Sequence, residues 1–128
     1  MKGLLIGMGL AATWLPIAAI AETESDPRDK IQFELDQLDA DGRYTLFQEP
    51  RAIAYEFCIP NDRAVIKTVQ SIDRTLILFL NRPGQVNCEA DELLAVGETR
   101  QPNPRAVLIQ LARLPQVTRI EPSWDGAL

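Results

Sequence analysis

The sequence contains no histidine, which removes the commonest general base near neutral pH and the commonest side-chain ligand of metal ions. Lysine is also scarce: beyond Lys2, only Lys30 and Lys67 occur, and neither lies in a motif for nucleophilic catalysis. The two cysteines are too far apart for a Cys-x-x-Cys redox or metal motif. We therefore expect a non-enzymatic protein with no catalytic residues, no cofactor and no metal site.

An excess of basic residues is missing as well. The formal net charge is −5, and eight of the acidic residues lie within residues 22–41, where only Arg28 and Lys30 oppose them. From residue 51 onward, nine acidic residues are balanced by nine arginines and lysines. Because nucleic acids and anionic lipids attract basic surfaces, we expect no nucleic-acid partner.

Residues 1–21 have the pattern of a secretory signal peptide. Lys2 precedes a short apolar run over residues 4–15, and Ala19-Ile20-Ala21 forms a small-x-small cleavage site. The alternative is an uncleaved N-terminal anchor, which Pro16 and the short run disfavour. We expect export to the periplasm, to another extracytoplasmic compartment or to the medium, with no membrane insertion after cleavage.

Cys58 and Cys88 are the only cysteines, and an exported protein retains disulfides. A bond between them closes a loop of about 30 residues, which stabilises a fold by roughly 3–4 kcal/mol on the chain-entropy model. We predict a structural disulfide.

Residues 51–122 divide into six elements. Alternating apolar residues, caps and turn residues predict strands over 53–58, 75–80, 93–98 and 117–121, a helix from an Asn61 cap to about residue 72, and a helix from Asn103-Pro104 to Pro115. The order β-α-β-β-α-β is that of an α+β, ferredoxin-like two-layer sandwich. In that topology the third strand lies between the first two, which brings Cys58 and Cys88 to one edge.

The acidic segment before this domain, residues 22–50, has two interpretations. Ile31, Leu35 and Leu38 share a helical face behind an Asp26-Pro27 cap, and we favour this helix. Ile31, Phe33 and Leu35 also alternate, so a hairpin turning at residues 39–42 is the alternative. We expect four parts in the chain: signal peptide 1–21, N-terminal arm 22–50, ferredoxin-like domain 51–122 and C-terminal tail 123–128.

Asp39-x-Asp41-Gly42 resembles part of a calcium-binding EF-hand loop. Aligned on Gly42, the first and twelfth loop positions are Gln37 and Gln48, and neither offers the carboxylate that calcium requires there. We interpret residues 39–42 as a turn with Gly42 at positive φ.

Residues 75–80 read Thr-Leu-Ile-Leu-Phe-Leu, apolar on both faces, although this strand should lie at an edge. In a two-layer sandwich the helices cover only one face of the sheet, so Ile77 and Phe79, or the alternate leucines, need other cover. We favour cover by the N-terminal arm; the alternative is a partner protein or a second copy. Trp124, beyond the last strand, is a further candidate contact residue.

Arg100 and Arg105 flank the start of the second predicted helix. Free backbone N–H groups and the helix dipole favour anions there, so these arginines are candidate anion ligands. The simpler interpretation is a capped loop whose arginines pair with acids or water.

Two functions follow from these features. The first is an exported protein-binding domain, for example an inhibitor or an assembly factor, whose partner is an exported or membrane protein, or itself. An inhibitor would use residues 123–128 as its inserted tail. The second is a small-anion sensor or carrier that uses Arg100 and Arg105.

Overall fold

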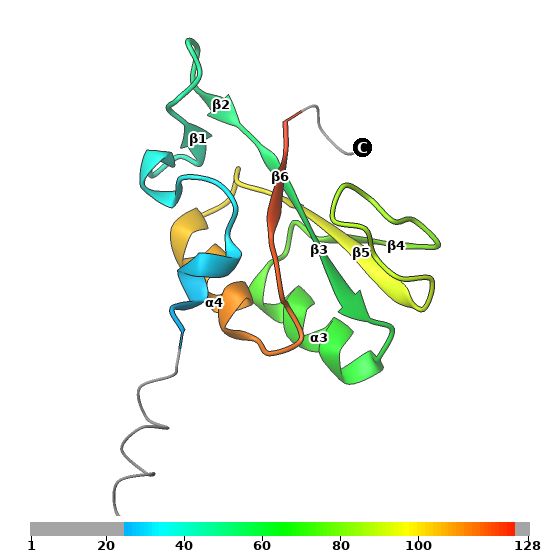
Figure 1. The fold of residues 1–128 in the computed structure, drawn as a ribbon. Coiled ribbons are helices and arrows are strands. Elements are labelled where there is room, and N and C mark those ends of the chain that lie inside the picture. Colours follow the sequence, from blue (N-terminus) through cyan, green and yellow to red (C-terminus); the bar gives the residue numbers. More distant parts are fainter. Residues whose placement is uncertain (1–24, 125–128) are drawn as a thin grey trace, which may run out of the picture.

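The fold of residues 25–124, the part of the chain that the computed structural model describes, is α+β (Figure 1). Two α-helices accompany two sheets of antiparallel strands, and one disulfide joins Cys58 to Cys88 as predicted. The predicted signal peptide and residues 125–128 of the tail lie outside the described residues. Within residues 25–124, no helix has the length and apolar character needed to cross a membrane.

The main sheet has the strand order β4-β5-β3-β6. Its strands are β3 (Ala54–Pro60), β4 (Ile77–Leu80), β5 (Glu92–Glu98) and β6 (Glu121–Ser123). All neighbours are antiparallel, and the longest pairing joins β3 to β5 along their whole length. β5 therefore lies between β3 and β4, and β4 forms one edge of the sheet.

The helices α3 (Arg63–Ile72) and α4 (Pro104–Arg113) pack on one face of this sheet. Their apolar spacing places Val69 of α3 and Leu108 and Leu111 of α4 in the core, where all three are fully buried. Along a strand, successive side chains point to opposite faces of the sheet, and Tyr55 and Phe57 of β3 point into this core.

The N-cap of α3 is Asp62, so the prediction of Asn61 is wrong by one residue. Asp62 Oδ1 accepts the backbone N–H groups of Ala64 and Val65, and its negative charge suits a helix N-terminus. Asn103 does hold the N-cap position of α4, but in a left-handed conformation and without a side-chain capping bond.

The last strand begins later than its sequence pattern suggests. Residues 117–121 are the predicted strand, but β6 spans Glu121–Ser123 and pairs with β3. Ile120 instead forms a parallel bridge with Ile31: its N–H donates to Lys30 O and its carbonyl accepts the N–H of Gln32. The N-terminal segment (residues 25–52) thus pairs with the chain directly before β6.

The N-terminal segment forms no α-helix, so the favoured prediction of a helix that follows Asp26-Pro27 and ends before Gly42 is wrong. It contains two short 3-10 helices, η1 (Pro27–Lys30) and η2 (Leu35–Gln37), and a small sheet of β1 (Arg43–Tyr44) and β2 (Arg51–Ala52). Asp26 caps η1 as expected, but Ile31 is extended because its neighbours pair with Ile120.

The apolar residues of the N-terminal segment join the helix-side core. Ile31, Leu38 and Tyr44 are buried there, and η1 lies beside α4 (Figure 1). The face of the sheet opposite the helices is called the second face below. The prediction that the N-terminal segment covers this face is therefore wrong.

The second face is covered instead by the β4–β5 loop (residues 81–91). Val86 and Cys88 of this loop are buried against Leu94 and Val96 of β5, and Phe79 of β4 packs on the same cluster. Figure 1 shows the loop on the side of the molecule opposite the N-terminal segment. The disulfide between Cys88 and Cys58 therefore closes the loop over this face.

Gly42 has φ +83°, as predicted for the turn at residues 39–42. Asp39 Oδ1 accepts the backbone N–H groups of Asp41 and Arg43, and the bond from Arg43 is the main reason that the pKa of Asp39 is lowered. Gly42 also packs on Thr99, whose hydroxyl donates to Gly42 O at 2.5 Å. A Cβ at Gly42 would lie 1.9 Å from Thr99 O.

We predict that Gly42→Ala lowers the free energy of unfolding by roughly 2–4 kcal/mol, because it combines a strained φ with a backbone clash. Urea denaturation measures this loss. Gln48→Ala, at an exposed position of the same segment, is the control and should change stability by less than about 0.5 kcal/mol. Equal stability of the two variants would contradict the described packing of Gly42.

Candidate functional site

The open edge of the sheet is β4, which pairs with β5 on one side. Within residues 25–124, no strand pairs with its other side. Ile77 and Leu80 are 44% and 58% exposed, and they are two of the four large apolar side chains that the described chain exposes. An edge strand presents free N–H and C=O groups, so β4 combines unpaired backbone with apolar side chains.

Phe79 differs from Ile77, although both point to the second face of the sheet. Phe79 is half-buried against Val86 and Leu94, and the Arg82 guanidinium lies 4.3 Å from the centre of its ring. Of the predicted partner residues on this strand, Ile77 is the more accessible.

Two hydrogen bonds besides the disulfide hold the β4–β5 loop on the sheet. The N–H of Gln85 donates to Glu56 Oε1 at 2.8 Å, and Arg119 Nη2 donates to Val86 O at 3.0 Å. Within the loop, the N–H of Cys88 donates to Pro83 O. The loop is therefore anchored to β3, through Glu56 and Cys58, and to the chain before β6.

Glu56 is a buried carboxylate, only 3% exposed, at the centre of this anchoring. Gly84 passes directly over it with φ +63°, and a Cβ at Gly84 would lie 2.6 Å from Glu56 Oε1 and from Leu94 Cδ1. The close approach of Gly84 lets the next N–H, that of Gln85, reach the carboxylate. Sequence analysis did not single out Glu56, because an alternating strand pattern does not reveal which polar residue has a buried partner.

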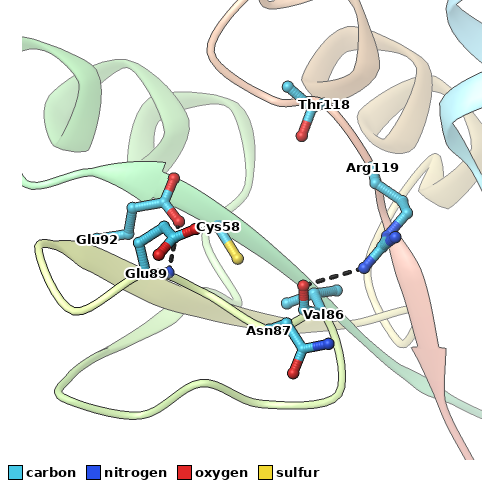
Figure 2. Close-up of a pocket in the computed structure, with 7 residues that line it drawn as sticks. All are labelled: Cys58, Val86, Asn87, Glu89, Glu92, Thr118 and Arg119. Carbon is cyan, nitrogen blue, oxygen red and sulfur yellow. Dashed lines mark hydrogen bonds between the residues drawn. The ribbon is translucent and has the colours of Figure 1, made fainter.

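A pocket of about 460 Å³ lies between this loop and the chain before β6 (Figure 2). Figure 2 shows the Cys58 sulfur facing it, with Glu89 and Glu92 on one side and Arg119 on the other. Cys58 Sγ, Cys88 Sγ and a Glu92 oxygen lie within 4.8 Å of one another. The two sulfurs are bonded to each other, so they offer no thiolate to a metal or a substrate.

A larger hollow of about 800 Å³ lies at the Leu80 end of β4. Its lining contains four acidic residues and no basic one: Asp62, Glu89, Asp91 and Glu92. We call these four residues the acidic rim. The acidic rim places negatively charged side chains around the hollow at the Leu80 end of β4.

Arg100 and Arg105, the predicted anion ligands, have different surroundings. Arg105 Nε and Nη2 donate to Leu38 O at 2.8 and 2.6 Å, and Nη2 also donates to Asp36 O. Arg100 is exposed beside the buried Thr99. The Arg105 guanidinium thus fastens the N-terminal segment to α4, and an anion would compete with carbonyl oxygens for it.

Trp124 lies far from β4, near the opposite edge of the sheet. It is 42% exposed and packs against Tyr44 and Phe47, with ring centroids 5.4 and 5.6 Å away. The Arg51 guanidinium lies 4.4 Å from the centre of the Phe47 ring. The structure therefore does not bring Trp124 together with Ile77 and Phe79. Trp124 instead packs the chain after β6 against the N-terminal segment.

A buried polar network links the two layers and was not foreseen from the sequence. Tyr55 donates its hydroxyl to Asp73 Oδ2 at 2.5 Å, and Asp73 Oδ1 accepts the N–H and hydroxyl of Thr75. Gln101 Nε2 donates to Tyr55 Oη and Asp73 Oδ1. Burial and the Asp73 charge raise the pKa of Tyr55 well above its usual value near 10.

Comparison of the chain with protein-family models, with curated proteins and with solved structures gives no match.

We predict that Tyr55→Phe destabilises the protein by about 1.5–3 kcal/mol near neutral pH, because Asp73 loses a buried donor. The raised pKa of Tyr55 stabilises the native state below pH 10, and that stabilisation is lost as pH rises through the native-state pKa. The difference in stability between wild type and Tyr55→Phe should therefore shrink above pH 10.

Urea denaturation of both proteins between pH 7 and 11 measures this. Tyr44→Phe, which removes the other tyrosine hydroxyl, is the matched control. If the difference in free energy of unfolding between wild type and Tyr55→Phe stays constant to pH 11, the Tyr55 hydroxyl is not buried against Asp73.

We predict that Glu56→Ala loosens the β4–β5 loop, because the N–H of Gln85 loses its acceptor; the cost should be about 1–3 kcal/mol. Glu56→Gln keeps a carbonyl oxygen and should recover most of the loss. Hydrogen exchange at Gln85, followed by NMR, provides the second readout. Unchanged exchange at Gln85 in Glu56→Ala would contradict the anchoring role of Glu56.

Proposed function

We propose that this protein is an exported, disulfide-stabilised domain that binds another protein by adding a strand to the β4 edge. The observation that carries the proposal is the open edge itself: unpaired backbone beside exposed Ile77 and Leu80. Main-chain hydrogen bonds along β4 would supply affinity, and the two apolar side chains would supply contact on both faces of the added strand.

The fold assignment within this proposal is a ferredoxin-like sandwich. The strand order β4-β5-β3-β6, read from the opposite edge, is fourth, first, third, second within the six-element domain, with both helices on one face. This arrangement supports the split β-α-β topology. Export is supported by the leader pattern of residues 1–21 and by the disulfide, which persists outside the reducing cytosol.

The protein-binding proposal accounts for the described surface better than the anion proposal does. Arg105 is already hydrogen-bonded to carbonyl oxygens of the N-terminal segment, whereas β4 has no strand on its outer side within the described chain. The inhibitor variant, with residues 123–128 as its tail, has less support because Trp124 packs on Tyr44 and Phe47.

We predict that a photoreactive benzoylphenylalanine at Leu80 or Ile77 forms a covalent protein–protein product when the full-length precursor is expressed and exported in cells. The same group at Leu46, which is 59% exposed on the N-terminal segment, is the control. Gel analysis and mass spectrometry identify the products. Equal products at Leu46 and Leu80, or none at either β4 position, would contradict binding at this edge.

A further inference from the structure

We propose that the β4 edge binds an extended segment of another exported protein, with a lysine or arginine opposite Leu80 and an apolar residue opposite Ile77. This inference rests on the proposed function and specifies the chemistry of the partner. It comes from the different surroundings of the two ends of β4.

The Leu80 end of β4 is acidic. The acidic rim surrounds the hollow of about 800 Å³ that Leu80 also lines. Within residues 25–124, none of the four rim carboxylates forms an ion pair. Arg63 and Arg82, the nearest cations along the chain, do not line the hollow, and Arg82 lies over the Phe79 ring. Like charges around one concave surface repel one another and attract a cation, so this end of β4 favours a positively charged side chain.

Two of the rim carboxylates have no hydrogen-bond partner in the described chain. Asp62 caps α3, and Glu92 Oε1 accepts the N–H of Glu89 at 2.8 Å. Glu89 and Asp91 are exposed, and among residues 25–124 their carboxylates accept no hydrogen bond. These two carboxylates are therefore the ones available to a cation from a partner.

Leu80 itself favours a long basic side chain over a short or purely apolar one. It is 58% exposed and also lines the acidic hollow. Directly opposed residues on neighbouring strands place their side chains on the same face of a sheet. A lysine or arginine opposite Leu80 would pack its alkyl stem on the leucine and extend its charge into the hollow. An apolar residue there would leave the rim without a counter-charge.

The Ile77 end of β4 favours an apolar side chain. Ile77, Ala54 and Val96 line a depression of about 260 Å³, in which Glu98 is the one charged lining residue. Positions 77 and 80 are three apart, so their side chains point to opposite faces of the sheet. The partner segment would therefore carry its basic and apolar residues three positions apart, one on each face.

Photocapture at Ile77 in two charge-matched variants tests the rim contact. Benzoylphenylalanine is placed at Ile77 of the full-length precursor, which is expressed and exported in cells. Glu89→Gln/Asp91→Asn should reduce the yield of partner photoproduct at least about threefold, because the added cation loses its two available counter-charges. Glu34→Gln/Glu49→Gln makes the same change in net charge at exposed positions of the N-terminal segment and should leave the yield unchanged. Circular dichroism and melting temperature confirm that each purified variant is folded.

The attached partner segment provides the second readout. Tandem mass spectrometry of the Ile77 photoproduct should find a lysine or arginine about three residues from the attachment site. Equal yields in the two variants, an attached segment without a basic residue, or a product of two copies of this chain would overturn the basic-segment proposal, while strand addition at β4 stands. If neither Ile77 nor Leu80 gives a photoproduct, the proposed function falls and this inference falls with it.

Discussion

The disulfide between Cys58 and Cys88 is the constraint on which the rest of this structure depends. Two helices cover only one face of the four-stranded sheet, and the apolar residues Phe79, Leu94 and Val96 lie on the other. The β4–β5 loop has no regular structure of its own, so its position over that face needs external attachment. The disulfide supplies this attachment covalently, and Glu56 adds a buried hydrogen bond beside it.

With both faces covered, the two edges of the sheet differ in their surroundings. The N-terminal segment bridges Ile120 just before β6 and packs on Trp124 just after it, so contacts gather at that side of the sheet. The opposite side, β4, has no such neighbour among residues 25–124. Exposed Ile77 and Leu80 therefore lie on a strand whose outer backbone pairs with no other strand of residues 25–124.

The sequence predicted most of what local pattern can specify. The disulfide, the two helices and the strands β3, β4 and β5 follow from alternation, helical spacing and the separation of the cysteines. The helix prediction for the N-terminal segment was wrong because Ile31 fits a helical and a strand period equally well. Pairing with Ile120 makes Ile31 extended. The burial of Glu56 and Asp73 was missed because Gln85, the partner of Glu56, and Tyr55 and Gln101, two partners of Asp73, are distant in sequence and leave no local signal.

Native-state hydrogen exchange of the oxidised protein tests the central claim most directly, namely that the β4–β5 loop is a fixed cover of the sheet. The amides of Gln85 and Cys88, which donate to Glu56 and Pro83, should exchange far more slowly than an unstructured chain. Reduction of the disulfide should accelerate both, while the amides between β3 and β5 stay protected. Exchange of Gln85 and Cys88 at the unstructured rate with the disulfide intact would contradict the account.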